Sequence, residues 1–320
     1  MGVDSGLPDF RGRDGFWRAY PALQHRGLSF EDMANPAAFA GHQELAWGFY
    51  GHRLKFYCET VPHEGFAILR RWTDRMSRGA FVFTSNVDGQ FQKAGFCESG
   101  VHECHGSIHP LKCMDGRIND TWSATGFNPL VNDETSLLES PMPRCLRCGS
   151  LARPNILMFE DWSWVDAPYE KQRERLDAWN SSVSKLVVVE LGAGIALPKV
   201  RRFSEKCARN RLVRINPREA STNPLHGVGI EGGPWRYSSY STWRFGEGRS
   251  RMYFHRMRNR TSMRCNLPHS QRLGLGDAVG CRLEVVKAEN LAEARCSAGL
   301  RCHCPVVVEL YAVWEPSESV

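Results

Sequence analysis

Apolar residues recur at two different spacings along the first two thirds of the chain. In residues 42–57 and 63–76 they return every three or four positions with charged residues between them, which predicts two amphipathic helices. Four short apolar runs are instead continuous, as in strands that are buried on both faces of a sheet. These runs lie at 80–84, 155–159, 186–189 and 212–215. Their alternation with helical segments predicts an α/β fold, a Rossmann-like parallel sheet with helices on both faces.

The pattern changes near residue 220. Residues 223–234 are rich in glycine and proline, which predicts a loop. Arginine and aromatic residues then interleave from 235 to 264 without a helical or strand period, and only Val306–Trp314 has the pattern of a strand. We interpret 221–320 as a basic, Gly/Arg-rich extension of unassigned fold. Such residues can stack on bases and contact phosphates, but a plain extension is the favoured interpretation, and we expect no nucleic-acid partner.

The composition excludes several classes of protein. With 42% hydrophobic and 24% charged residues, the chain is neither mainly disordered nor fibrous. Its 41 Lys and Arg against 35 Asp and Glu give a net charge of +6, too mild an excess to imply an anionic partner. No apolar run reaches the roughly 18–20 residues of a membrane span, and the first residues do not resemble a signal peptide. We therefore expect a cytoplasmic protein with no membrane partner.

Polar or glycine-containing motifs stand where several predicted strands end, which is where parallel sheets bind their ligands. Glycines 192 and 194 would let the backbone approach a phosphate, although such a turn also occurs without a ligand. Asn86 and Asp88 can bind a ribose or an amide, or can simply shape a turn. The motifs are Ser-Gly-Leu-Pro-Asp-Phe-Arg-Gly at 5–12, Thr-Ser-Asn-Val-Asp-Gly at 84–89, His-Gly-Ser-Ile-His at 105–109, Gly-Ala-Gly at 192–194 and Ile-Asn-Pro-Arg-Glu at 215–219.

Taken in this order, the five motifs resemble those of the sirtuin family of NAD-dependent protein deacylases, in a bacterial-type form. The resemblance covers roughly residues 1–219. It implies one domain at 1–220, with a Rossmann-like core at 1–104 and 156–220 and a small zinc-ribbon-like insert at 105–155. It also implies NAD as a co-substrate and acylated lysine side chains of proteins as the substrates.

The resemblance assigns a set of residues to NAD binding. In the family, the aromatic residue matching Phe10 covers the space that nicotinamide leaves, and the arginine matching Arg11 orients the cofactor. The residues matching Asn86 and Asp88 line the nicotinamide pocket, and the one matching Asn216 lies near the adenosine ribose. The full set is Pro8, Asp9, Phe10, Arg11, Ser85, Asn86, Asp88, Gly192, Ala193, Gly194 and Asn216.

His105 is the expected general base, because histidine titrates near neutral pH and can accept a proton from a ribose hydroxyl. His102 and His109 compete for this role, but only His105 precedes Gly-Ser-Ile-His as the family's catalytic histidine does. In the implied reaction the acyl-lysine oxygen attacks the anomeric carbon and nicotinamide leaves. His105 then deprotonates a ribose hydroxyl, which attacks the imidate carbon. The products are free lysine and O-acyl-ADP-ribose.

Two segments are candidates for contact with the acylated protein. Tyr50 and Arg53 lie on one face of a predicted helix. They resemble the Tyr-x-x-Arg pair by which one sirtuin class recognises succinyl and malonyl groups, since arginine binds carboxylates bidentately. The alternative is a solvated arginine on an amphipathic helix. Phe159 lies in a segment that resembles the family's peptide-pairing strand. Met158 and Glu160 replace the family's residues there, and we expect Glu160, in place of glycine, to alter peptide choice.

Zinc binding is incompletely predicted. Cys145 and Cys148 form a C-x-x-C knuckle, and Cys113 matches the first cysteine of the family's other pair. The second cysteine of that pair is missing. The alternatives for the fourth ligand are Asp115, Asp120 and Cys104. A further group is spaced too closely for a usual knuckle, and we interpret it as reactive or incidental: Cys296, Cys302, His303 and Cys304.

The chain also departs from the family at its start. Met1–Asp4 stands where the family's first strand and Gly-Ala-Gly turn would already have ended. We expect this to lower stability and cofactor affinity, because neighbouring strand edges would be exposed. Two alternatives to the deacylase therefore stay open. One is an NAD hydrolase or ADP-ribosyltransferase, which would pass the ribosyl group to water or a side chain. The other is a catalytically weak NAD-binding protein.

Overall fold

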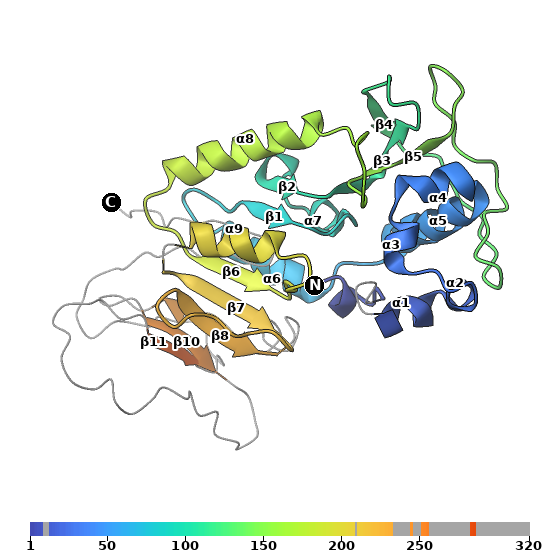
Figure 1. The fold of residues 1–320 in the computed structure, drawn as a ribbon. Coiled ribbons are helices and arrows are strands. Elements are labelled where there is room, and N and C mark those ends of the chain that lie inside the picture. The colour runs from blue at the N-terminus through green and yellow to red at the C-terminus, as the bar shows by residue number, and fades with distance from the viewer. Residues whose placement is uncertain (9–12, 209, 233–243, 246–250, 256–281, 286–320) are drawn as a thin grey trace.

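The computed structural model describes residues 1–8, 13–208, 210–232, 244–245, 251–255 and 282–285 (Figure 1). The helices expected at 42–57 and 63–76 are confirmed as α5 and α6. The described helices are η1 (Val3–Ser5), α1 (Arg13–Ala19), α2 (Pro21–His25), α3 (Phe30–Met33), α4 (Pro36–Gly41), α5 (Gln43–Glu59), α6 (Glu64–Thr73), α7 (Gln90–Lys93), η2 (Glu98–Gly100), α8 (Ala167–Ser182) and α9 (Lys199–Cys207).

Most of the strands fall into two parallel ladders and one antiparallel sheet. The strands expected at 80–84, 186–189 and 212–215 are confirmed as β1, β6 and β7. In the described part of the chain, β1 pairs with β2 in one parallel ladder, and β6, β7 and β8 form another. The strands are β1 (Val82–Thr84), β2 (Val101–Glu103), β3 (Gly106–Cys113), β4 (Thr121–Ser123), β5 (Ala152–Ile156), β6 (Val188–Leu191), β7 (Leu212–Asn216), β8 (Gly227–Glu231), β9 (Arg244–Phe245), β10 (Arg251–His255) and β11 (Arg282–Val285).

Helices cover both faces of the parallel strands. Val189 and Leu191 point to the face where α6 packs, and their neighbour Val188 points to the opposite face. Phe66 of α6 belongs to the first cluster, and Leu176 of α8 to the second. Each cluster also contains side chains from β1, so the two ladders share both hydrophobic layers (Figure 1). The predicted α/β class, with helices on both faces of parallel strands, is confirmed.

The strand expected at 155–159 is wrong in its range and its partner. Strand β5 ends at Ile156 and pairs antiparallel with β3, in a sheet of order β4-β3-β5. The reason is that the backbone beyond Ile156 bonds elsewhere: Leu157 N donates to His105 O at 2.9 Å and Phe159 N donates to Ala34 O at 2.8 Å. The apolar run therefore spans a strand end and the loop that follows it.

The loop expected at 223–234 is also wrong, because it contains β8. This strand pairs parallel with β7 in register, from Gly227 opposite Leu212 onward. Its glycines conceal the strand pattern, yet they are needed there. A Cβ on Gly227 would lie 2.0 Å from Leu212 O, and one on Gly229 would lie 2.1 Å from Ala220 O. The parallel ladder therefore continues beyond residue 220.

Helix α5 is buried along most of its length and is not amphipathic as expected. One side of it is covered by the segment 129–138, which packs directly against two helix glycines. A Cβ on Gly48 would lie 1.9 Å from Ser136 O, and one on Gly51 would lie 2.7 Å from Pro129 Cβ. Tyr50 and Arg53, on this helix, also lie inside the protein.

Several expectations fall outside the described residues. They are the strand at 306–314, the cysteine cluster at 296–304 and the cofactor residues Asp9, Phe10 and Arg11. Most of the arginine-rich segment 235–264 lies outside as well. Across the described segments, no helix combines the length and the apolar composition that crossing a membrane requires.

Candidate functional site

His105 lies in the tight turn between β2 and β3, where three segments meet (Figure 1). Cys104 N donates to Thr84 O at the end of β1, at 2.8 Å. Leu157 N donates to His105 O at 2.9 Å, and the Lys199 ammonium donates to Cys104 O at 2.7 Å. The predicted base is therefore fixed between the end of β1, the segment after β5 and the start of α9.

The turn after β1 brings Ser85, Asn86 and Asp88 to the same edge of the fold. Asn86 N donates to Thr84 Oγ1 at 2.9 Å, which leaves the half-buried side chains of Ser85 and Asn86 at the turn surface. Asp88 is buried, burial raises its pKa, and one of its oxygens accepts from Gln90 N at 3.0 Å. Their binding roles remain predictions, but the structure places all three beside the His105 turn.

His109 packs behind this turn. Its Nε2 lies 3.2 Å from Asp88 O, and the adjacent Gly89 has a φ of +67°. A Cβ on Gly89 would lie 2.6 Å from the same Nε2, so glycine is needed there for both backbone conformation and space. His102 is buried on β2, and burial lowers its pKa to about 4. Neither competitor therefore occupies the turn position of His105.

Glu103 is a buried carboxyl group that the sequence analysis did not single out. It lies two residues before His105, is 5% exposed, and burial raises its pKa to about 7. Its backbone N donates to Gln172 Oε1 on α8 at 2.8 Å. An acidic residue two positions before the 105–109 motif was the signal available in the sequence.

The Gly-Ala-Gly turn follows β6, as expected. Gly192 has a φ of +71°, and its N donates to Ile215 O at 2.8 Å. Asn216 donates from Nδ2 to Ala193 O at 3.0 Å, and its Oδ1 accepts from the backbone of residues 218 and 219. Asn216 is thus brought to the turn, where it shapes the backbone on both sides.

Arg201, on α9, is a second residue that the sequence analysis missed. Its Nε donates to Ala193 O at 2.9 Å, and its Nη2 lies 3.4 Å from Glu219 Oε2. The same carboxylate accepts from Ile195 N at 3.0 Å. The turn is therefore fixed from the side opposite β7 as well.

Tyr50 and Arg53 form the centre of a buried aromatic cluster, which we call the Arg53 cluster. The Arg53 guanidinium carbon lies 5.1–5.9 Å from the ring centroids of Phe30, Phe49, Tyr50 and Tyr57. Arg53 Nε and Nη2 both donate to Tyr57 Oη, at 2.9 and 2.8 Å. The Tyr50 hydroxyl is buried and finds no hydrogen-bond partner in the described structure. The expectation of a solvated arginine is thereby excluded.

Phe159 lies beside the Arg53 cluster. Its ring centroid is 6.5 Å from that of Phe30, at an interplanar angle of 86°, and Phe30 in turn contacts the Arg53 guanidinium. The following residue, Glu160, has a φ of +55°, a conformation that costs a non-glycine residue about 1–2 kcal/mol. Glu160, at the position where the family has glycine, therefore adopts a left-handed backbone conformation.

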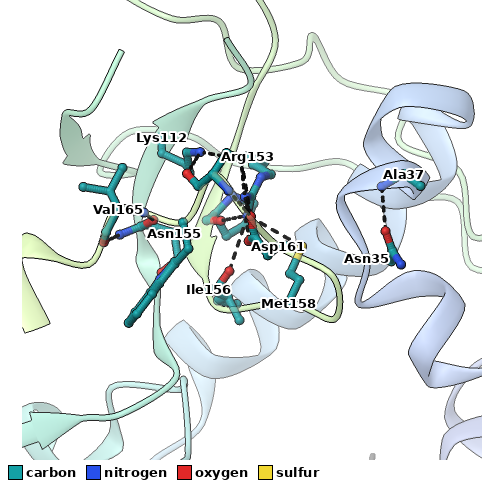
Figure 2. Close-up of polar contacts among 12 residues, drawn as sticks. Asn35, Ala37, Lys112, Arg153, Asn155, Ile156, Met158, Asp161 and Val165 are labelled. Atoms are coloured by element: carbon teal, nitrogen blue, oxygen red, sulfur yellow. Dashed lines mark hydrogen bonds and ion pairs between the residues drawn. The ribbon is translucent and has the colours of Figure 1, made fainter. Parts of the chain in front are cut away.

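A buried ion pair holds the segment around Phe159 (Figure 2). The side chains of Arg153 and Asp161 are both fully buried, and Arg153 Nη2 lies 2.7 Å from each Asp161 oxygen. Ser163 N donates to Asp161 Oδ1 at 3.1 Å, and the Lys112 ammonium donates to Ser163 O. Asn155 binds the backbone of Val165 from both ends of its amide, at 2.9 and 3.1 Å.

Cys113, Cys145 and Cys148 lie together at the end of β3 and in the knuckle that follows. Their sulfur atoms are all within 4.8 Å of one another, and Cys113 Sγ lies 3.5 Å from Cys148 Sγ. This arrangement fits three of the four ligand positions of structural zinc. Of the alternatives for the fourth, Asp115 and Asp120 are paired with arginines, and Cys104 is buried in another hydrophobic cluster.

The predicted site residues therefore fall into three places. His105, Ser85, Asn86 and Asp88 surround one turn; Gly192, Ala193, Gly194 and Asn216 form a second; Tyr50, Arg53 and Phe159 form the third. Pro8 is described and half-buried, but the rest of its loop is not. The cysteines lie apart, at the insert.

The chain is similar to known proteins of one family. The Sir2 family model matches residues 1–178. The NAD-dependent protein deacylase of Pyrococcus furiosus is 33% identical over 237 residues, covering 72% of this chain and 84% of the relative. The enzyme of the same name from Aquifex aeolicus is 29% identical over 223 residues, covering 68% of this chain and 80% of the relative.

Solved structures show the same fold. A crystal structure of a Sir2 homologue in complex with NAD is 24% identical, covers 73% of this chain and 80% of its own, and has a TM-score of 0.53. A mutant Sir2 homologue in complex with ADP ribose is also 24% identical, with coverages of 73% and 83% and a TM-score of 0.54. The family model spans more than half of the sequence, and the chain belongs to the Sir2 family.

Proposed function

We propose that this chain is an NAD-dependent protein-lysine deacylase that releases nicotinamide and O-acyl-ADP-ribose. The observation that supports this best is the position of His105. Its turn is bonded on one side to Lys199, directly behind the glycine turn, and on the other to Leu157, directly before Phe159. A base at this point would reach both a dinucleotide and an acylated lysine.

The residues that would bind NAD are those at the two strand-end turns. The glycine turn offers its backbone to the phosphates, while Ser85, Asn86 and Asp88 offer polar side chains to the nicotinamide end. NAD supplies the bond between nicotinamide and ribose that the reaction breaks. The chain's own contribution is to orient the two substrates and to accept a proton from a ribose hydroxyl at His105.

The Arg53 cluster supports a preference for acidic acyl groups such as succinyl or malonyl. Burial raises the pKa of Tyr50 to about 12, so its hydroxyl stays protonated and can donate a hydrogen bond. That hydroxyl belongs to the same cluster as a guanidinium group, and a carboxylate bound there would accept from both. An acetyl group, which has no distal carboxylate, would leave the Tyr50 hydroxyl unsatisfied.

Three cysteines would hold zinc in this proposal. Cys113, Cys145 and Cys148 would cross-link the end of β3 to the knuckle before β5, which stabilises the small sheet. The ion would act there as a structural link, because the cluster lies in the insert and not at the His105 turn.

Mass-spectrometric product analysis tests the activity. Wild-type chain and His105→Ala are incubated with NAD and matched acetyl- and succinyl-lysine peptides. We expect O-acyl-ADP-ribose and free lysine from the wild type, and a loss of roughly 10²–10⁴-fold in His105→Ala. Nicotinamide released without peptide would instead favour the hydrolase or transferase. No product from any mixture would contradict an enzymatic role.

The acyl preference is tested separately with Tyr50→Phe and Arg53→Met. Both variants should lose roughly 10- to 100-fold in kcat/KM for the succinyl peptide, since each removes a bond to a charged group. The acetyl peptide is the control, and its turnover should change little. Equal losses on both peptides would mean that these residues support the fold and do not select the acyl group.

A further inference from the structure

Trp162 is 97% exposed although the chain on either side of it is firmly anchored. We call residues 157–164 the Trp162 loop. Asp161, before the tryptophan, has a fully buried side chain bound by Arg153, and Ser163, after it, is bonded by Asp161 and Lys112. Figure 2 shows this anchor. Tryptophan is enriched at interfaces, and a fixed backbone lowers the entropy cost of binding through an exposed indole.

The Trp162 loop begins at the proposed catalytic turn. Leu157 N donates to His105 O, and two residues later Phe159 packs against Phe30 at the edge of the Arg53 cluster. An acylated lysine that reaches between Phe159 and His105 would place its neighbours in the substrate chain along the rest of this loop. Trp162 is the exposed aromatic residue that they would meet.

Exposed carboxylates lie on the side of the Trp162 loop that faces α3 and α4. Glu160 is exposed, and its Oε2 lies 3.4 Å from Asn35 Nδ2 at the start of α4. On α3, next to Phe30, Glu31 and Asp32 are also exposed. Hydrogen bonds from Ser29 lower the pKa of Asp32, which keeps it ionised. An aromatic face beside carboxylates is the environment that attracts a lysine or arginine side chain.

We propose that Trp162 and Glu160 bind a basic side chain of the protein substrate, a few residues away from the acyl-lysine. The ring would stack on the cation, and the carboxylate would neutralise its charge. The inference relies on the proposed function for the position of the acyl-lysine. It assigns to this chain a preference for acylation sites in basic sequences.

Peptide binding tests the inference independently of turnover. Fluorescence anisotropy is measured with two labelled acyl-lysine peptides that differ only in having arginine or alanine a few residues away from the acyl-lysine. The wild type should bind the arginine peptide about 5- to 20-fold more tightly. Trp162→Ala and Glu160→Gln should each lose most of that preference, with affinity for the alanine peptide nearly unchanged. Trp162→Phe, which keeps an aromatic face, should retain part of it.

Leu225→Ala is the matched control, because Leu225 is 77% exposed and lies beyond β7, away from the Trp162 loop. It should keep the wild-type preference. Equal weakening of both peptides by Trp162→Ala, or no wild-type preference, would overturn the proposal. A wild type that prefers the arginine peptide but deacylates none would overturn the proposed function alone. Deacylation without a flanking preference would overturn the basic-residue contact alone.

Discussion

The Trp162 loop and the glycine turn are held by the same two types of residue in different surroundings. Each has one asparagine that clamps the backbone through both ends of its amide: Asn155 binds Val165, and Asn216 binds Ala193 and the chain after β7. Each also has one arginine, Arg153 or Arg201. The two segments therefore differ in burial and not in the type of anchor.

The ion pairs show the difference. The side chains of Arg153 and Asp161 are both 0% exposed, and the shortest N–O distance is 2.7 Å. The side chains of Arg201 and Glu219 are 10% and 33% exposed, and their distance is 3.4 Å. A fully buried ion pair fixes one geometry. In a partly exposed ion pair, either side chain can exchange its partner for water or a ligand. The Trp162 loop is thus fixed in advance, while the glycine turn can adjust to a phosphate.

Breaking the two ion pairs should give the largest difference in stability between the two segments. Asp161→Ala leaves the Arg153 charge buried and unpaired, so the free energy of unfolding should fall by about 3–5 kcal/mol. Glu219→Ala removes a partly exposed carboxylate while Arg201 keeps its bonds to Ala193 O and to the backbone of residue 219, so it should cost at most about 1 kcal/mol. Urea denaturation monitored by circular dichroism measures both. Similar losses in the two variants would show that the burial difference has no energetic consequence.

Glu103 lies directly before the two residues that connect these segments. Cys104 O accepts from Lys199, and His105 O accepts from Leu157. Burial raises its pKa from 4.5 to about 7 in the folded chain. Folding therefore favours its protonated form, and this contribution to stability is complete below pH 4.5. It is lost as pH rises to about 7.

The contribution of Glu103 to the free energy of unfolding should fall by on the order of 3 kcal/mol across that pH range. Urea unfolding of wild type and Glu103→Gln at pH 5, 6, 7 and 8 measures it as the difference between the two proteins. Taking the difference removes the opposite contributions of His63 and His102, whose pKa values burial lowers to about 4. A difference that is constant with pH would contradict the assignment.

Replacing either asparagine should lower the stability of the protein by a similar amount, but only one of the replacements should weaken NAD binding. Asn155→Ala and Asn216→Ala each leave buried backbone groups unsatisfied, so each should cost about 1–3 kcal/mol. Calorimetric titration should then show weaker NAD binding for Asn216→Ala only, because Asn155 supports the peptide side. Equal losses of NAD affinity would mean that the two segments are not separable.

Local patterns in the sequence sufficed to predict much of this arrangement. The apolar runs located β1, β6 and β7, and the motifs after β1 and β6 located the turn with Asn86 and the glycine turn. These features depend on residues that are close in sequence. Strand β8 was missed because its glycines look like a loop, although their missing side chains are what permits the close approach to Leu212 and Ala220.

The anchors could not be predicted in the same way. Arg153 and Asp161 are eight residues apart across a turn, and many other acids were equally available to that arginine. The burial of Arg53 was also unpredictable, because it depends on Phe30, from a separate helix, packing against the guanidinium group. Partners chosen by tertiary packing leave no periodic trace in the sequence.

The smallest effect should come from the contact that joins the glycine turn to the catalytic turn. Lys199→Met removes the bond from Nζ to Cys104 O but keeps most of the aliphatic side chain. Since Lys199 is exposed, the cost in stability should be only about 0.5–1.5 kcal/mol. Its effect should appear instead in turnover, because the His105 backbone loses its support from the cofactor side. A lower kcat with unchanged peptide affinity would support this coupling, and an unchanged kcat would show that the Leu157 bond alone positions His105.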